Sequence, residues 1–333
     1  MPLDVLVAGL VPPIDAPPEM RGLRLPALEK WLARADIVRG EATNPGDWLA
    51  SAFGLPSPPA FAAIALAADA APDPGAWMSA DPVHIRIERD RTSMHAAAVL
   101  HVRADESAAL VEALNRHFRG DGLEFWAPVP DRWYVKAPQG ELPATTPLDE
   151  ALGRDVEKLL PATRGAIKWA AVLTEIQMIF SAHDVNAQRE RERKPVINSV
   201  WFWGGGELPA HVASPYGVIH ADDAFARGLA TVAGKTSAAA PQRLSDIDAH
   251  PVEWTLAMND VLSRAIRRAD ADAWCAAARQ LDDEWFTDLG ETIARFGVVR
   301  IILPAAVGTL VASLARNARW RIFRPRRAVA AYA

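Results

Sequence analysis

The sequence reads His183-Asp-Val-Asn186-Ala-Gln-Arg189 and then Pro195-Val-Ile-Asn198-Ser-Val-Trp-Phe-Trp203-Gly204-Gly205-Gly206. This stretch is the most informative part of the chain. Residues 196–203 are rich in β-branched and aromatic side chains, which favour a strand. The three glycines that follow end the strand, because a backbone without side chains can turn sharply or approach a ligand closely. The stretch therefore predicts a strand that leads directly into a candidate binding turn.

The side chains around this strand admit two interpretations. The Arg189 guanidinium, with His183 and Asn186, could hold a phosphate or a carboxylate, since a guanidinium donates paired hydrogen bonds to either anion. The alternative is a network of helix caps that supports the strand. Trp201 and Trp203 share one face, which is typical of a core, with a ligand-stacking wall as the alternative. The candidate ligand-binding residues are His183, Asn186, Arg189, Asn198, Trp203, Gly204, Gly205 and Gly206.

Strands and helices alternate on both sides of this stretch. Residues 4–11 form a short apolar run, as expected of a buried strand in a mostly parallel sheet, and Pro26 opens a helical pattern. Residues 297–314 read as a buried strand, a turn and a helix. Further elements are predicted as strands at 217–220 and helices at 222–232 and 258–268. The pattern predicts an α/β fold with a doubly wound, mostly parallel sheet.

A change of pattern at residue 81 marks a second unit. Residues 83–88 alternate apolar and polar side chains, which is typical of a half-buried strand. Further predicted strands up to residue 136 surround one amphipathic helix at 105–118, and this combination indicates a small inserted α+β cap. We expect the chain to divide into a core domain of residues 1–80 and 141–315, an inserted cap of residues 81–140 and a basic C-terminal tail of residues 316–333.

The composition limits the partners and the compartment. The chain has 333 residues and a formal net charge of −5, so its bulk charge gives no sign of a nucleic-acid partner. The single cysteine, Cys275, excludes an internal disulfide and a four-thiolate zinc site. The first residues lack the basic region of a signal peptide, and no apolar run is long enough to span a membrane. We expect a cytoplasmic protein without a membrane span.

Two polar clusters stand outside the central stretch. Residues 316–327 hold six arginines, with Trp320 and Phe323 between them. Such a tail could contact nucleic acid or an anionic membrane, but we favour a solvated or self-docking tail and expect no nucleic acid, with a protein partner as a further possibility. Asp246, Asp248 and His250 could bind one metal, although a solvated loop is the preferred interpretation.

The segment His183-Asp-Val-Asn186, Arg189, Asn198 and the glycine turn, followed by Tyr216-Gly217, resembles a block in the archaeal-type cofactor-independent phosphoglycerate mutases. The strand that begins at Asp81 and the helix that begins near Pro26 resemble further parts of that family. The resemblance also extends to a bacterial group labelled as regulatory proteins of the pathogenicity-factor (rpf) type. It implies an alkaline-phosphatase-like fold, in which a doubly wound α/β sheet carries a cap.

The chain departs from this family where the family's chemistry lies. The resemblance implies two manganese-like metals, held by Asp and His ligands, and a serine that is transiently phosphorylated. The place of the first ligand reads Gly9-Leu10, and the place of the serine reads Asn44-Pro-Gly-Asp47, with Ser51 displaced onto a helix. The strand expected to carry late ligands begins at Arg300 and offers none. A two-metal site without most of its ligands holds neither metal nor an activated serine.

These departures lead to a functional hypothesis. We expect a catalytically degenerate phosphoglycerate mutase-like protein with a non-catalytic binding or regulatory role, no catalytic residues, no metal and no cofactor. A phosphorylated small molecule is the expected ligand. The alternative is an active, metal-dependent mutase that interconverts 3- and 2-phosphoglycerate, or a related phosphoesterase, with manganese or a similar metal as its cofactor.

Overall fold

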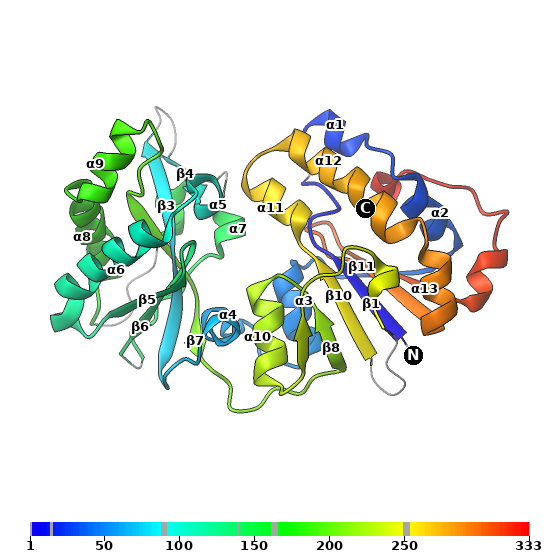
Figure 1. Cartoon of the computed structure of the whole chain (residues 1–333), viewed down its shortest axis with the longest axis horizontal. Coiled ribbons are helices and arrows are strands. Elements are labelled where there is room, and N and C mark those ends of the chain that lie inside the picture. Colours follow the sequence, from blue (N-terminus) through cyan, green and yellow to red (C-terminus); the bar gives the residue numbers. More distant parts are fainter. Residues whose placement is uncertain are drawn as a thin grey trace. The chain divides into compact units, whose positions relative to one another are not determined.

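The computed structural model describes residues 2–13, 16–87, 92–138, 140–152, 154–160, 166–248 and 254–332. The chain forms two compact units, which Figure 1 shows with their elements labelled. The first, the α/β unit, contains Met1–Ser57 and His211–Ala333, and the second, the antiparallel unit, contains Pro58–Ala210. Each unit has its own sheet.

The α/β unit is built on a seven-stranded, mostly parallel sheet. Strand β1 pairs in parallel with β10 and β11, β10 with β8, and β8 with β9, whereas β12 is antiparallel to β11 and β2. In sheet order the strands are β2 (Asp36–Gly40), β12 (Thr309–Ala315), β11 (Val298–Leu303), β1 (Pro2–Val7), β10 (Trp254–Asn259), β8 (Tyr216–His220) and β9 (Thr236–Ala238). The predicted mostly parallel α/β sheet is confirmed.

Helices cover both faces of this sheet, as the doubly wound class requires (Figure 1). One layer buries large side chains of its helices against β1 and β11 and is tied together by the Trp31 indole, which donates to the Phe286 carbonyl at 2.9 Å. That layer holds α1 (Pro18–Arg21), α2 (Pro26–Arg34), α11 (Val261–Arg267), α12 (Ala271–Leu281) and α13 (Leu289–Phe296). The other face carries α3 (Pro45–Ala52) and α10 (Ala224–Val232).

The antiparallel unit is built around the long strand β3 (Ala76–Ile87), one edge of which pairs with β7 (Ser199–Glu207). Its other edge pairs first with β6 and then with β4. The remaining strands are β4 (Thr92–Ala96), β5 (Glu124–Val129) and β6 (Arg132–Ala137). Helices α6 (Ala104–Phe118) and α8 (Trp169–Ser181) bury one face of the sheet, and α4 (Phe61–Asp69) buries the Trp77 and Tyr134 side chains of the other.

The antiparallel unit is larger than the expected cap of residues 81–140. Strand β7, which we assigned to the core, hydrogen-bonds to β3 from Val83↔Ser199 to Ala76↔Glu207 and so belongs to the second sheet. Helices α8 and α9 (Asp184–Arg191) precede β7 in the same unit. The expected boundary was too narrow because an apolar strand pattern reports burial and does not identify the sheet that the strand joins.

Two expected helices are wholly or partly strands. Residues Thr309–Ala315, read as the helix after β11, form β12 and pair antiparallel with β11. The helix expected at 258–268 is shorter, because residues up to Asn259 belong to β10 and α11 begins at Val261. Short apolar runs fit a buried strand and a buried helix equally well, so periodicity does not separate them.

Candidate functional site

Asn186 acts as a clamp between α9 and the chain that leads into β7. Its side-chain nitrogen donates to the Phe180 carbonyl at 2.8 Å and the Ile197 carbonyl at 2.7 Å, and its oxygen accepts from the Ile197 amide at 2.8 Å. The side chain is 4% exposed. His183 is the N-cap of α9, where Nδ1 accepts from the Val185 amide at 3.2 Å. These are the contacts that the cap-network interpretation predicts.

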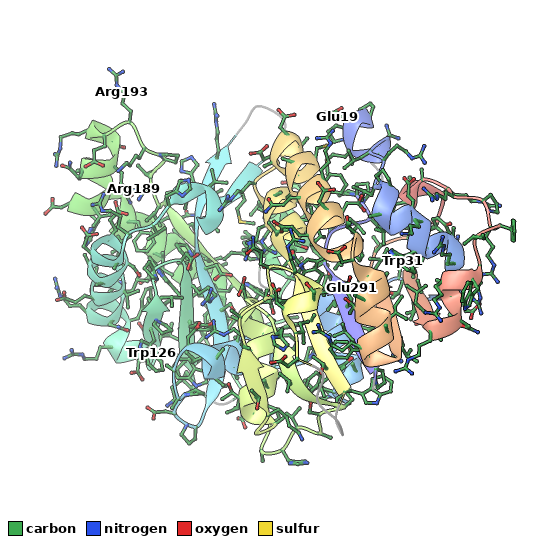
Figure 2. The ribbon with its side chains drawn as sticks, turned by 45° about the vertical axis from the view of Figure 1, so that its right-hand side comes forward. Glu19, Trp31, Trp126, Arg189, Arg193 and Glu291 are labelled. Carbon is green, nitrogen blue, oxygen red and sulfur yellow. The ribbon has the colours of Figure 1, made fainter. Side chains whose placement is uncertain are left out.

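Arg189 lies inside the antiparallel unit, and each nitrogen of its guanidinium donates a hydrogen bond. Nε donates to the Pro195 carbonyl at 2.7 Å, Nη1 to Glu106 Oε2 at 2.7 Å and Nη2 to the Leu100 carbonyl at 2.5 Å. Arg189 is 1% exposed, and Figure 2 shows it within the unit, whereas the neighbouring Arg193 projects outward. The guanidinium therefore binds protein groups at the positions where an anion would have to bind.

Asn198 extends the pairing of β7 with β3 by one side chain. Its side-chain oxygen accepts from the Ile85 amide and its side-chain nitrogen donates to the Ile85 carbonyl, both at 2.7 Å. The side-chain amide thus imitates a peptide group of a neighbouring strand. This contact fixes the register of β7 where the strand begins.

The three glycines are explained by the close approach of other protein segments. A Cβ on Gly206 would lie 2.5 Å from the Ala60 Cβ, one on Gly204 would lie 2.8 Å from the Phe61 Cβ, and one on Gly205 would lie 3.0 Å from a Leu142 methyl. Gly204 also has a φ of +67°, which glycine adopts without strain. The glycines lie within β7, which runs to Glu207, so they do not end the strand as expected. Phe61 and Ala60 at the start of α4 approach Gly204 and Gly206, and Leu142 approaches Gly205, so protein fills the space beside all three.

The candidate residues do not converge on one place. Asn198 directly precedes β7, and Gly206 lies eight residues further on, which corresponds to about 26 Å along an extended strand. The residues of α9 lie near the beginning of β7, whereas Trp203 and the glycines lie near its end. Ligand binding by these residues stays a prediction, and the hydrogen bonds of Asn186 and Arg189 support the cap-network interpretation.

Asp81 is a polar residue that the sequence reasoning missed. It lies opposite Trp201 in the register of β3 and β7 and is 7% exposed, and the Trp203 indole donates to its Oδ2 at 2.6 Å. Burial raises the pKa of this carboxyl to about 7, although the indole hydrogen bond opposes the shift. Only its position in a strand of otherwise buried residues, directly before Pro82, could have drawn attention to it.

A second group of polar side chains lies on the same face of the sheet. Tyr134 is 1% exposed and its hydroxyl oxygen has no hydrogen-bond partner, and burial raises the pKa of this phenol. On the same strand, Arg132 donates to both oxygens of Asp69 at 2.9–3.1 Å. This face of the antiparallel unit therefore concentrates buried polar groups that no sequence motif identified.

The carboxyl ends of the parallel strands are where a two-metal site of the implied family would have to form. Strand β1 leads into Gly9 and Leu10, and a Cβ on Gly9 would lie 2.7 Å from the Ser263 amide. Strand β11 leads into Pro304 and Ala305. The position expected for the serine is Asp47, which accepts a hydrogen bond of 2.8 Å from the Asn44 side chain at the start of α3. Gly9, Leu10, Pro304 and Ala305 carry no metal-binding side chain, and the Asp47 carboxylate is hydrogen-bonded at the start of α3.

The carboxylates that do lie near this edge already have partners. Asp260 forms ion pairs with Arg264 at 3.0 Å and Arg267 at 3.9 Å. Asp222 accepts from the Ala240 amide, and Asp223 caps α10. Among the described residues, no three His, Cys, Asp or Glu side chains are grouped so that they could hold a metal, and Asp15 and His250 lie outside those residues. The described carboxylates Asp260, Asp222 and Asp223 therefore bind protein groups.

An ion pair between the buried Asp4 and the partly exposed Arg300 lies in the same sheet. Asp4 on β1 is 0% exposed and accepts hydrogen bonds from Arg300 on the adjacent β11 and from the Tyr216 hydroxyl at 2.8 Å. The Arg300 guanidinium lies 4.3 Å from the centre of the Trp254 ring. The arginine at the place expected for a late metal ligand is thus part of a structural network that links three parallel strands.

No helix in the described part of the chain is long and apolar enough to cross a membrane.

No family model matches the sequence. The search for similar folds finds the PH0037 protein from Pyrococcus horikoshii, with a TM-score of 0.56 and 12% identity, over 94% of this chain and 87% of that one. This likeness shows that the two chains share a fold.

The curated proteins that match this sequence are named as phosphoglycerate mutases. The 2,3-bisphosphoglycerate-independent phosphoglycerate mutase of Methanosarcina mazei is 25% identical over 203 residues, and that of Methanosarcina barkeri is 26% identical over 142 residues. These matches cover 58% and 40% of this chain, and they span only 51% and 35% of the relatives' own length. The chain is accordingly a distant homologue of the cofactor-independent phosphoglycerate mutases.

Proposed function

We propose that this protein is a non-catalytic homologue of the phosphoglycerate mutases, with a binding or regulatory role. One observation carries the proposal. The carboxyl edge of the parallel sheet presents Gly9, Leu10, Pro304 and Ala305, and its carboxylate Asp260 is paired with arginines. Two-metal phosphoryl transfer needs carboxylate and imidazole ligands together with an activated nucleophile at one place. Among the described residues, these five supply neither.

The proposed ligand is a phosphorylated metabolite of the phosphoglycerate class. The homology to enzymes that act on phosphoglycerate supports this choice. A protein that loses catalytic groups but keeps the scaffold can still recognise the same anion through cationic and backbone groups. A regulatory role of the rpf type is part of the same proposal, in which occupancy by the metabolite would be the signal.

The alternative is an active metal-dependent mutase or phosphoesterase. The homology to named mutases favours it, since those relatives carry the activity in their names. It requires metal ligands from positions other than those that the resemblance indicates. Stoichiometric manganese in the purified protein would favour this alternative.

The decisive experiment is a coupled assay for the interconversion of 3- and 2-phosphoglycerate with added manganese. We expect no turnover above a metal-free blank from protein shown to be folded by circular dichroism. In the same preparation we expect 3-phosphoglycerate to raise the melting temperature, because a ligand that binds only the folded state stabilises it. Turnover near an ordinary enzyme rate of about 10 per second would refute the non-catalytic proposal.

A control removes ambiguity from a negative assay. A known mutase added to the same reaction must restore turnover, which shows that the coupling enzymes and the metal are active. If this protein shows neither turnover nor a thermal shift with phosphoglycerate, the proposed ligand class is wrong even though the absence of catalysis stands.

A further inference from the structure

The arginine-rich segment folds back onto the α/β unit and is anchored there on both sides of a turn. The short helices η5 (Arg316–Trp320) and η6 (Val329–Ala331) flank the turn. Ala318 and Val329 are 1% and 6% exposed and pack into the core cluster of the α/β unit. Arg321 donates to Asp36 at 2.6 Å, which fixes the turn to the start of β2. The expectation of a self-docking tail therefore holds for this anchored part.

The turn between these anchors presents large apolar side chains to solvent. Trp320 is 71% exposed, Ile322 is 59% exposed and Phe323 is 93% exposed. Burying large apolar side chains stabilises a protein, so leaving three of them exposed to water within four residues is unfavourable. Since the anchors hold the turn in place, these side chains have no route into the core of the α/β unit.

Positive charge surrounds the exposed apolar side chains. The exposed arginines of the segment are Arg316, Arg319, Arg324, Arg326 and Arg327. The Arg319 guanidinium lies 4.9 Å from the centre of the Trp320 ring, so cation and indole form one patch. Residues 292–333 contain eight arginines and no acidic residue, whereas the whole chain has a net charge of −5. The charge is strongly segregated toward this segment.

We propose that residues 316–327 form a peripheral binding surface for an anionic lipid bilayer. Indoles are favoured at the level of the headgroups, and arginine forks onto phosphate oxygens. Stable attachment needs an apolar and an electrostatic signal together, and this surface supplies both. Ile322, between Trp320 and Phe323, fits the acyl boundary and offers no ring for stacking, which favours a bilayer over the bases of a single-stranded nucleic acid.

The test is cosedimentation of the full chain with vesicles of phosphatidylcholine alone and of phosphatidylcholine mixed with phosphatidylglycerol. We expect binding to the mixed vesicles only. Replacing Arg326→Gln and Arg327→Gln together should weaken that binding by about 25-fold, since each arginine near an anionic surface contributes about fivefold. Replacing Trp320→Ser and Phe323→Ser should weaken it at least about tenfold, because the apolar part of the signal is lost.

Matched controls lie in the antiparallel unit. Met178 is 68% exposed, and the Arg116 side chain is 75% exposed, so Met178→Ser and Arg116→Gln change the same kinds of surface group elsewhere. Both variants should bind as the natural sequence does. Brominated lipids should quench part of the tryptophan fluorescence, and Trp320→Phe should remove that quenching, which places this indole in the interface.

Three results would overturn the proposal. The first is folded protein that does not sediment with the mixed vesicles, or that sediments equally with neutral ones. The second is binding to a single-stranded oligonucleotide without binding to vesicles, which would make the surface a nucleic-acid site. The third is concentration-dependent self-association that disappears with Phe323→Ser while vesicle binding is absent, which would make it an interface between copies of the chain.

Discussion

The Arg189 guanidinium donates a hydrogen bond of 2.7 Å to the Glu106 carboxylate, and the two side chains are 1% and 2% exposed. The same carboxylate oxygen accepts from the Arg103 amide at 2.9 Å and so caps α6. The pair therefore joins α9, which precedes β7, to α6 on the same face of the antiparallel sheet. This ion pair explains why Arg189, which resembles a ligand-binding residue, is buried.

Replacing Arg189→Met should destabilise the protein strongly. The change leaves the buried Glu106 carboxylate with only the partly exposed Arg103 guanidinium, 3.3 Å away, as a cationic partner. Breaking a buried pair in this way costs about 3–5 kcal/mol. Urea unfolding measures the loss. The double variant Arg189→Met with Glu106→Gln should recover part of it, because no uncompensated charge remains. An Arg189→Met variant as stable as the natural sequence, but with weaker metabolite binding, would return Arg189 to the candidate binding residues.

Replacing Asn186→Ala should cost about 3 kcal/mol of unfolding free energy. The change leaves the buried Ile197 amide and carbonyl without their side-chain partner, whereas the Phe180 carbonyl keeps the His183 amide at 3.2 Å, and each unpaired group costs about 1–3 kcal/mol. The matched control is Asn317→Ala, because Asn317 is exposed. Equal stability of the two variants in urea unfolding would show that the clamp does not support β7.

Replacing Gly206→Ala should destabilise the antiparallel unit by about 1–3 kcal/mol, the usual cost of overpacking. The new Cβ would lie 2.5 Å from the Ala60 Cβ and 2.9 Å from its Cα, so the chain that leads into α4 must move. The control is Gly120→Ala, where nothing lies within 4 Å of an added Cβ. If Gly206→Ala instead left the melting temperature unchanged and removed binding of phosphoglycerate, the turn would be a ligand site.

The stability of the protein should fall as the pH rises from about 4 to about 7. Burial raises the pKa of Asp81 to about 7, so the folded state holds a proton that the unfolded state releases near its ordinary value of 3.8. The group is neutral in both states below the unfolded pKa, and its cost grows as the pH rises toward the folded pKa. One pKa unit corresponds to about 1.4 kcal/mol, so the total decline is a few kcal/mol.

Asp81→Asn provides the control for this pH dependence. Asparagine keeps an oxygen that can accept from the Trp203 indole, as Asp81 does at 2.6 Å, but it does not ionise. The variant should lose the decline between about pH 4 and pH 7 and be more stable than the natural sequence at neutral pH. Parallel stability curves for the two proteins across this range would show that another group titrates.

Part of the candidate site could be predicted from the sequence, because a helix cap contacts residues that are close to it along the chain. His183 caps α9 three residues before Asn186 contacts Ile197, and a cap network was one of the two interpretations of this segment. The roles of Arg189 and Asp81 were not accessible. Their partners, Glu106 and Trp203, lie 83 and 122 residues away along the chain. Packing of α9 on α6 brings the first pair together, and pairing of β3 with β7 brings the second.

The sequence by itself determined the class of the larger unit. Apolar runs such as Leu3–Val7 and Val299–Leu303 predict buried strands wherever they lie in the chain, because their burial depends on composition and period alone. Only long-range contacts determine that β7 joins β3 in a second sheet, that β12 is a strand, and that Gly204 and Gly206 admit the start of α4 while Gly205 admits Leu142. The physical reason is that hydrophobic burial is non-directional, whereas strand partners and close approaches are set by contacts between residues far apart in the chain.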